Sequence, residues 1–232
     1  KKFRWYNLKL PLSVNFEPME ILDLATAAEV ADKLLEIQAI RLQPEKPFTW
    51  ASGWKSPIYC DNRLSLSFPE VRKLIRDQLV KSVMHCFPEA EAIAGVATAG
   101  IPQGALIANE LDLPFIYVRS KPKGHGMENM IEGKVTPGQK VVVVEDLVST
   151  GGSSLKAAED LKNAGFEVMG MVAIFSYGFD VAAQNFENAG IKLVCLCTYD
   201  HLLPRAVQRK YINEEALESL GEWRKDPGSW KQ

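Results

Sequence analysis

The chain has 232 residues, enough for one large α/β domain or for one domain with a small appendage. Its 27 Lys and Arg residues nearly balance its 29 Asp and Glu residues, so no overall positive charge indicates nucleic acid or an acidic membrane surface as a partner. No run of about 18 apolar residues occurs, which excludes a membrane-spanning helix. Small molecules are the expected partners.

Residues 1–18 form a poor signal peptide, because polar residues and Pro11 interrupt any apolar run and no small-residue cleavage site follows. Met19 directly precedes a segment with good helical character. We therefore expect Met19 to be the natural start and residues 1–18 to be an extra leader. Residues 19–232 are expected to form a single domain, of which approximately 19–68 is an N-terminal hood of helix and hairpin.

Two helices and a hairpin are predicted in the first part of the chain. Apolar residues at helical spacing predict a helix over about 27–42. A second helix, with Pro69 in its first turn, has the apolar stripe Val71, Ile75, Leu79 and Val83. The aromatic and turn residues of 48–63 predict a hairpin between these two helices.

From residue 92 onward, apolar runs alternate with helical segments. Strands are expected at 92–96, 115–119, 141–145, 167–175 and 191–197, and helices at 101–109, 153–164 and 181–189. This repeated β–α–β order predicts an α/β fold with a parallel sheet flanked by helices. The helical and charged stretch beyond Pro204 is assigned only a packing role.

The cysteines predict a reducing compartment and no zinc site. Cys195 and Cys197 lie in an apolar run where alternate residues share one face of a strand, so buried thiols are expected. A lone C-x-C lacks the second pair of a structural zinc site. Four cysteines in a chain of this length are ordinary, and the expected location is the cytoplasm.

The most informative segment is 145–154, which follows four consecutive valines at 141–144. Such a run supplies apolar side chains to both faces of a buried parallel strand and delivers the next residues to the carboxyl edge of the sheet, where ligands bind. Small and hydroxyl-bearing residues then let backbone N–H groups approach a phosphate at a helix N-terminus. Glu145 and Asp146 would repel a bare phosphate, but they suit sugar hydroxyls and Mg²⁺. A ribose 5-phosphate fits both halves.

Other phosphate-binding motifs do not fit this segment. It has no Gly-Lys-Ser/Thr ending, as a Walker loop requires, and no G-x-G-x-x-G followed by a distant acid, as dinucleotide binding requires. The alternative interpretation of 145–154 is an ordinary strand-to-helix turn.

A second segment, 120–136, is rich in glycine and has almost no apolar periodicity, so neither strand nor helix is predicted there. A loop of this length within a compact domain is usually a functional lid or disordered. Arg119, Lys121, Lys123 and His125 place cations near its start. We expect this loop to close over a polyanion; the alternative is a solvated surface loop.

Taken together, these segments resemble the type I phosphoribosyltransferases, and among them a bacterial branch of the orotate phosphoribosyltransferases. The resemblance covers about 49–175 and depends on four motifs, at 49–63, 95–102, 119–126 and 145–154. It implies a parallel sheet flanked by helices, with an N-terminal hood and a flexible catalytic loop. It also implies transfer of a phosphoribosyl group from phosphoribosyl pyrophosphate (PRPP) to orotate, giving orotidine 5-monophosphate and pyrophosphate, in pyrimidine synthesis.

The resemblance assigns catalytic roles to Arg119, Lys123, His125, Glu145 and Asp146, with the three cations clamping pyrophosphate. The loop would reach across a homodimer interface into the partner's site. The implied PRPP-binding residues are Thr98, Ala99, Gly100, Arg119, Lys123, His125, Glu145, Asp146, Leu147, Val148, Ser149, Thr150, Gly151, Gly152 and Ser153. No protein side chain is assigned as a direct Mg²⁺ ligand, and the ion is expected to arrive with PRPP near Glu145 and Asp146.

Tyr59, Lys55 and Ser149 are the candidates for orotate contacts, since a flat anionic ring favours an aromatic face and a few donors. An exposed hairpin lysine is the alternative interpretation of Lys55. Many relatives carry a lysine in place of Ala51, a Tyr-Lys pair at 98–99 and an arginine near 176–177. None of these cations is present here, so recognition of the orotate carboxylate is unassigned.

Three other functions stay open. The same phosphate cradle could serve a phosphoribosyltransferase for another base. A non-catalytic regulator of the same fold would bind nucleotides or RNA, although the balanced charge and the loop cations argue against it. A plain α/β domain without chemistry would leave four ordered motifs unexplained.

Overall fold

The computed structural model describes residues 19–50, 53–121 and 130–231. Its centre is a seven-stranded sheet with the order β1-β11-β10-β9-β6-β7-β8. These strands are β1 (Met19–Ile21), β6 (Ala92–Val96), β7 (Phe115–Val118), β8 (Ile131–Glu132), β9 (Lys140–Val148), β10 (Glu167–Ser176) and β11 (Leu193–Thr198). Every pairing in the sheet is parallel except that of β7 with β8. The predicted parallel sheet is confirmed.

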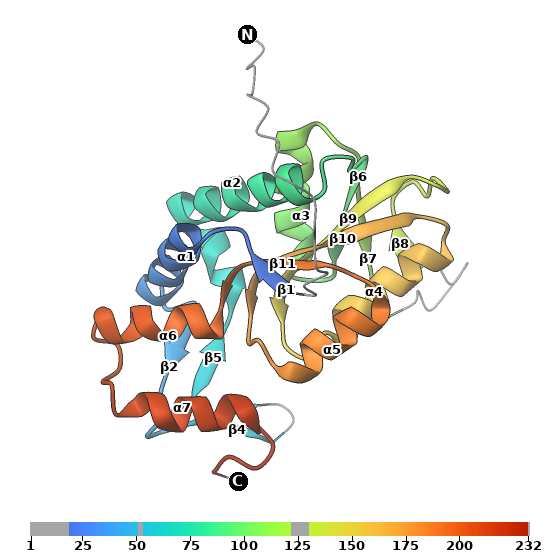
Figure 1. Ribbon diagram of the computed structural model, residues 1–232. Coiled ribbons are helices and arrows are strands. Elements are labelled where there is room, and N and C mark those ends of the chain that lie inside the picture. Colours follow the sequence, from blue (N-terminus) through green and yellow to red (C-terminus); the bar gives the residue numbers. More distant parts are fainter. Residues whose placement is uncertain (1–18, 51–52, 122–129, 232) are drawn as a thin grey trace, which may run out of the picture.

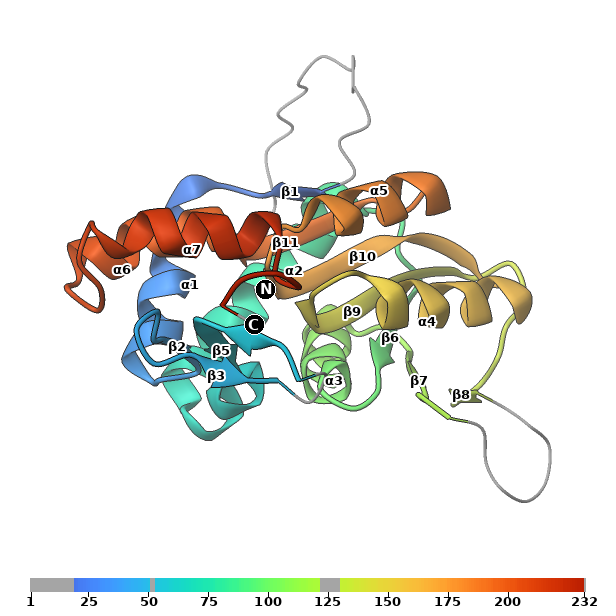
Figure 2. The same cartoon turned by 90° about the horizontal axis from the view of Figure 1, so that it is seen from below.

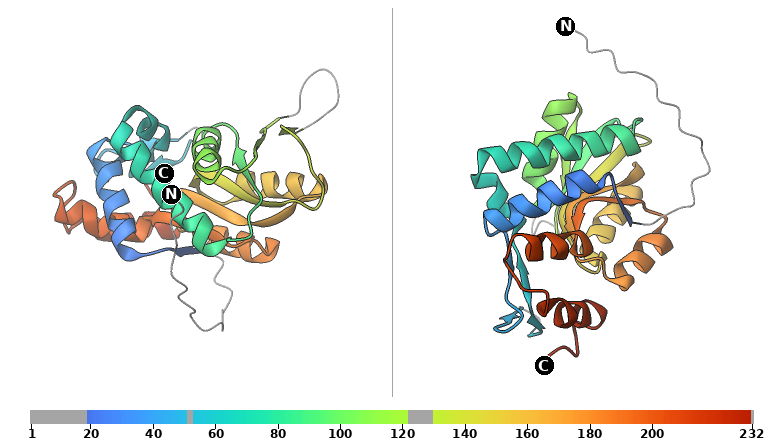
Figure 3. Two further views of the ribbon diagram at one scale, coloured as in Figure 1. Left: turned by 90° about the horizontal axis from the view of Figure 1, so that it is seen from above. Right: turned by 60° about the vertical axis from the view of Figure 1, so that its left-hand side comes forward.

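Helices cover both faces of this sheet. They are α1 (Leu24–Glu36), α2 (Pro69–Cys86), α3 (Gly100–Leu111), α4 (Gly152–Asn163), α5 (Asp180–Ala189), α6 (Tyr199–Gln208) and α7 (Ala216–Lys225). Figure 3 shows α1, α2 and α3 on one face and α4 and α5 on the other. The last two helices, α6 and α7, begin beyond the carboxyl end of β11 (Figure 1). None of the helices in the described parts of the chain has both the length and the apolar character needed to cross a membrane.

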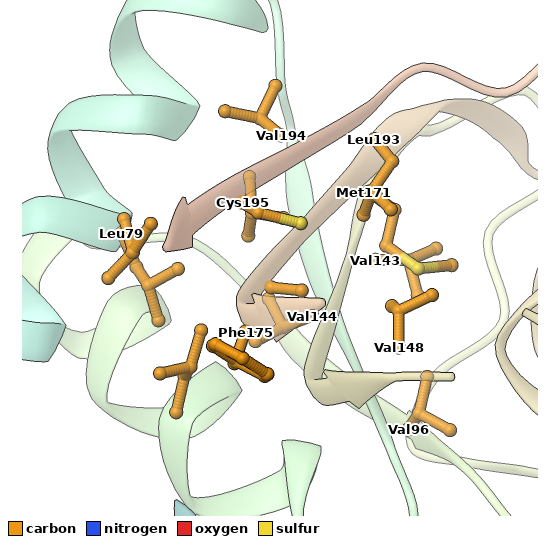
Figure 4. Close-up of a cluster of buried hydrophobic side chains, with 14 of the residues drawn as sticks. Leu79, Val96, Val143, Val144, Val148, Met171, Phe175, Leu193, Val194 and Cys195 are labelled. Atoms are coloured by element: carbon orange, nitrogen blue, oxygen red, sulfur yellow. The ribbon is translucent and has the colours of Figure 1, made fainter. Parts of the chain in front are cut away.

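The core lies along both faces of β9 and its neighbours. Val141, Val142, Val143 and Val144 have no exposed surface, because α3 packs on one side of β9 and α4 on the other. Burying one such side chain contributes roughly 1.5 kcal/mol or more. Figure 4 shows side chains of β9, β10 and β11 gathered with Leu79 of α2 and Val96 of β6 into a single apolar cluster. Cys195 and Cys197 of β11 are fully buried, as predicted.

Two small antiparallel pairs lie between α1 and α2. β2 (Ile40–Leu42) pairs with β5 (Ile58–Cys60), and β3 (Phe48–Thr49) pairs with β4 (Lys55–Ser56). A short 3₁₀ helix, η1 (Asn62–Ser67), then leads into α2. We call residues 40–67 the hairpin region. Within the predicted hood, β1 is a strand of the main sheet and α1 packs on one face of that sheet. The hairpin region projects beyond the carboxyl edge of the sheet, beside α7 (Figure 2).

The prediction of a helix as far as residue 42 was wrong. α1 ends at Glu36, Gln38 adopts a left-handed backbone with φ 57°, and β2 follows. Ile40 and Leu42 continue the apolar spacing of the helix, but they pair with β5 beyond the hairpin. The apolar periodicity of one segment does not reveal its pairing with a strand elsewhere in the chain.

The prediction of neither strand nor helix over 120–136 was also wrong at its end. β8 pairs there with β7, with Ile131 opposite Val118, and Ile131 is buried. The few apolar residues of this segment do not alternate regularly, which is too weak a signal for a strand. The strand β1, which pairs with β11, was not predicted either.

An ion cluster joins α1 to α6. Asp32 accepts hydrogen bonds from Arg205 Nε at 2.8 Å and from Arg209 Nη2 at 2.6 Å. The hydrogen bond from Arg205 lowers the pKa of Asp32 to about 2, against the opposing effect of partial burial. Because this pKa lies below the ordinary value of 3.8, the cluster stabilises the fold above that pH, and its contribution is lost as the pH falls through 2.

Asp32→Asn is expected to lower the free energy of unfolding by about 1–2 kcal/mol at pH 7, because both arginines lose a charged partner. Urea denaturation measures this loss, which should shrink only below about pH 4, where Asp32 of the unfolded chain begins to take up a proton. Glu36→Gln, in an exposed pair with Lys33, is the control and should leave stability unchanged. Equal behaviour of the two variants would contradict the prediction.

Candidate active site

The strand β9 carries two carboxylates to the carboxyl edge of the sheet. The predicted strand ended at Glu145, but β9 continues to Val148 because Leu147 pairs with Phe175 of β10. Glu145, Asp146, Leu147 and Val148 therefore belong to the strand, and the connection to α4 is only Ser149, Thr150 and Gly151.

Glu145 and Asp146 form a crowded acidic pair. Glu145 Oε1 accepts a hydrogen bond from Asp146 N at 3.0 Å, and Oε2 accepts one from Ser154 Oγ at 3.0 Å. The Glu145 side chain is only 6% exposed. Burial, together with the neighbouring carboxylate, raises the pKa of Glu145 to about 8, and burial also raises the pKa of Asp146. The end of β9 thus opposes ionisation of both carboxylates at once, and a bound cation would favour it.

This donor set fits a divalent cation that brings other ligands with it. Carboxylate oxygens are preferred Mg²⁺ ligands, and Mg²⁺ usually binds proteins through one or two carboxylates plus phosphate oxygens and water. Within residues 19–50, 53–121 and 130–231, no group of three or more His, Cys, Asp or Glu side chains is arranged to hold a metal ion. The pair at Glu145 and Asp146 therefore suits an ion shared with a phosphorylated ligand.

The predicted phosphate cradle lies at the start of α4. Gly151 has a left-handed backbone with φ 82°, and an added Cβ would lie 2.8 Å from Phe186 Cε2, so glycine is required there. Asn185 Nδ2 donates to Thr150 O at 2.9 Å and holds the loop from α5. No side chain caps the N-terminus of α4. Its first backbone N–H groups are therefore available to an anion.

A second helix N-terminus opens beside the same strand. Thr98 and Ala99 connect β6 to α3, and no side chain caps α3. An added Cβ at Gly100 would overlap the carbonyl oxygen of Val144, so only glycine lets α3 pack this closely on β9. The predicted residues Thr98, Ala99 and Gly100 thus lie next to the acidic strand, where a second anionic group would meet backbone donors.

The structure describes only part of the predicted cationic clamp. Arg119 follows β7, its backbone N–H donates to Met130 O at 2.7 Å, and its Nη1 lies 3.2 Å from Glu132 Oε1. Lys123 and His125 lie outside the described residues. Their predicted role rests on the sequence alone.

The hairpin region is tied directly to the acidic strand by Asn62, a residue to which the sequence gave no role of its own. Asn62 is 1% exposed, and its Nδ2 donates to Asp146 O at 2.7 Å. Its Oδ1 accepts from Cys60 Sγ at 3.4 Å. Arg63 binds Asp61 through two hydrogen bonds of 2.6 and 3.0 Å. Asn62 thereby fixes the position of the strand that presents the carboxylates.

The predicted orotate contacts are spread over the hairpin region and the cradle. On β5, Tyr59 lies on the face opposite to Ile58 and Cys60, and its ring contacts Phe48 at a centroid distance of 5.6 Å. Lys55 Nζ lies 3.2 Å from Thr49 Oγ1 across the β3–β4 hairpin. Ser149 is half-buried at the start of the cradle. The roles of these three side chains stay predictions.

An aromatic cluster closes the carboxyl edge beyond β10, and the sequence gave no indication of it. Tyr177 packs against Trp223 of α7 at 5.6 Å and against Trp50 of the hairpin region at 5.6 Å, centroid to centroid. Trp223 is fully buried. The C-terminal stretch thus reaches the candidate site, although its apolar helical positions could be assigned only to packing.

Comparison with known proteins identifies relatives of this chain in sequence and in structure. Residues 66–199 match the family described as "Phosphoribosyl transferase domain". An orotate phosphoribosyltransferase from Cytophaga hutchinsonii is 64% identical over 204 residues, which cover 88% of this chain and 98% of that protein. One from Porphyromonas gingivalis is 58% identical, with coverage of 87% and 96%. The crystal structure of orotate phosphoribosyltransferase from Aeropyrum pernix superimposes with a TM-score of 0.69 at 30% identity, covering 77% of this chain and 98% of that one.

The acidic pair predicts a stability that falls with pH. The pKa of Glu145 lies above the ordinary value of 4.5, so the unfolded chain releases this proton before the folded one does, and the fold loses stability between about pH 4.5 and 8. Glu145→Gln removes this cost. We expect the variant to match wild type at pH 5 and to be more stable at pH 8 by on the order of 3 kcal/mol.

Thermal or urea unfolding at both pH values tests this prediction. Glu159→Gln changes an exposed carboxylate of α4 and serves as the control, with no expected dependence on pH. A Glu145→Gln variant that is less stable than wild type at pH 8 would show that the ionised carboxylate stabilises the fold.

Proposed function

The chain belongs to the orotate phosphoribosyltransferases, a branch of the phosphoribosyltransferase family, and from this premise we propose how its residues carry out the reaction. The enzyme transfers the phosphoribosyl group of PRPP to orotate, giving orotidine 5-monophosphate and pyrophosphate in pyrimidine synthesis. The single observation that carries the assignment of the site is the acidic pair Glu145 and Asp146, immediately before the uncapped N-terminus of α4. We assign the ribose hydroxyls to this pair and the 5-phosphate to residues 147–153.

Bond changes at the anomeric carbon define what the protein has to supply. The bond from this carbon to the pyrophosphate oxygen breaks, and a bond to the ring nitrogen of orotate forms. Negative charge grows on the departing pyrophosphate while the sugar becomes oxocarbenium-like. Donors that are already oriented toward this charge lower the barrier most effectively. The N-terminus of α3 at Thr98, Ala99 and Gly100 supplies backbone donors, and Arg119, Lys123 and His125 are proposed to supply charge.

Magnesium is proposed as the cofactor. When bound with PRPP, Mg²⁺ neutralises phosphate charge and stabilises the leaving pyrophosphate. Glu145 and Asp146 would hold the hydrated ion and the sugar hydroxyls, since these side chains form the acidic pair beside the cradle. No general base is required, because orotate can enter as an anion at its reacting nitrogen.

Further parts of the proposal concern the assembly and the compartment. The family resemblance supports a homodimer in which the loop of one protomer, with Lys123 and His125, serves the site of its partner. The four cysteines carry free thiols, which supports the reducing cytoplasm as the location.

The assignment is tested by following orotate absorbance after PRPP and Mg²⁺ are added. We expect rapid, Mg²⁺-dependent loss of orotate and no comparable turnover of adenine, hypoxanthine or uracil. Turnover of a different base would keep the phosphate cradle and overturn the base assignment. If none of the four bases is consumed and the protein binds RNA tightly in a salt-sensitive manner, a regulator of the same fold would be favoured.

Lys123→Ala is expected to lower kcat by about 100-fold or more and to change orotate binding by less than about threefold, because the proposed contact strengthens only as pyrophosphate departs. Steady-state kinetics and equilibrium binding separate the two effects. Lys134→Ala alters an exposed lysine in the same part of the chain and serves as the control. Equal losses in turnover and orotate binding would argue against the clamp.

A further inference from the structure

Orotate differs from a neutral pyrimidine by its carboxylate, and a cation at the base end of the site would select for it. The chain has none at 98–99 or at Ser176 and Tyr177. We propose that Arg224 of α7 binds the orotate carboxylate and thereby determines which base is accepted. This inference rests on the proposed function and assigns to it a residue far from every motif that identified the family.

Arg224 lies against the turn that follows β10. Its Nη1 donates to Gly178 O at 2.6 Å, and Gly178 lies two positions beyond Ser176, the last residue of the strand. In the same turn, Tyr177 N donates to Val148 O at 3.1 Å. The turn is therefore bonded to the end of β9, next to the phosphate cradle. The proposal places the base of a sugar bound at the acidic pair beside this turn.

Gly178 leaves room for a side chain from elsewhere. It adopts a left-handed backbone with φ 64°, and a Cβ added there would lie 3.5 Å from Arg224 Nη1. The guanidinium group from α7 thus lies in van der Waals contact with the position at which a side chain of the turn itself would begin. The helix supplies a positive charge at a position where the turn has no side chain.

The charge of Arg224 is only weakly neutralised by its neighbours. Among the described residues, its acidic contact is Asp200, whose Oδ1 lies 3.5 Å from Nε. The side chain of Asp200 is 63% exposed, whereas that of Arg224 is 29% exposed. Because water screens an exposed ion pair, much of the positive charge stays available to a ligand. A planar guanidinium group can bind a carboxylate through two parallel hydrogen bonds.

The aromatic cluster holds α7 rigidly beside the turn. Trp223, the neighbour of Arg224, packs against Trp50 at 5.8 Å, Tyr177 at 5.6 Å and Phe179 at 5.5 Å, measured between ring centroids. These rings come from the hairpin region, from the turn after β10 and from α7. A cation on such a support needs little further ordering to bind a ligand.

Other described cations near this edge are less suitable. Arg63 binds Asp61 through two hydrogen bonds, which compensates its charge. Arg119 is paired with Glu132 and follows β7, and β6 and β9 separate that strand from β10. Arg41 is exposed and lies over the Tyr59 ring, 4.8 Å from its centroid. Lys55 of the hairpin region is the remaining candidate for the ring oxygens and does not compete for the position at Gly178.

The test is the steady-state kinetics of Arg224→Ala and Arg224→Lys in the full chain, with PRPP and Mg²⁺. We expect Arg224→Ala to raise the KM for orotate at least tenfold and to change the KM for PRPP less than threefold. Arg224→Lys keeps the charge but loses the planar fork, so it should recover part of the affinity for orotate. Lys225→Ala removes the exposed neighbouring charge on α7 and should behave as wild type.

The outcomes separate the possible failures. Suppose that the wild-type enzyme consumes orotate, and that Arg224→Ala raises the KM for orotate and the KM for PRPP equally or raises neither. This result would overturn the role of Arg224 and leave the proposed function intact. If Arg224→Ala does not fold, Arg224→Lys decides the matter, because a selective rise in the KM for orotate supports the proposal and wild-type values overturn it. Wild-type protein that does not consume orotate would overturn both proposals.

Discussion

Two neighbouring carboxylates held at the end of a buried strand are the constraint on which the rest of the site depends. Glu145 and Asp146 are close together and largely removed from water, an arrangement that opposes ionisation of both. The fold keeps them in place because the valines before them are buried on both faces, and because Asn62 anchors the Asp146 carbonyl. Stability is lowered to create a site that a cation and sugar hydroxyls can complete.

The sequence predicted the parts of the fold that follow from local patterns. Four consecutive valines fit a strand buried between two helix layers, and the strand from 92 to 96 was placed at its observed bounds. The prediction ended β9 too early because the residues from Glu145 onward are partly polar. Pairing with β10 keeps Leu147 and Val148 in the sheet, so tertiary structure overrides local composition.

What the sequence could not show depends on contacts between distant segments. The pairing of β1 with β11 and of β2 with β5 leaves no trace in either segment alone. Helical spacing shows that Trp223 lies on an apolar face of α7, but not that this face meets Tyr177 and Trp50. The roles of Lys123 and His125 come from the family resemblance and stand as predictions.

The same distinction between local and distant contacts applies to the two parts of the proposed site, one for the phosphoribosyl group and one for the base. The N-termini of α3 and α4 both lie beside β9, close to the acidic pair, and these are the positions proposed for two anionic groups and for the sugar between them. Motifs that are continuous in sequence build this part. The region proposed for the base is assembled from the hairpin region, the turn after β10 and α7, which lie far apart in the chain. Phosphoribosyl transfer could therefore be inferred from continuous motifs, whereas the proposed contact of the base with α7 involves segments that only the fold brings together.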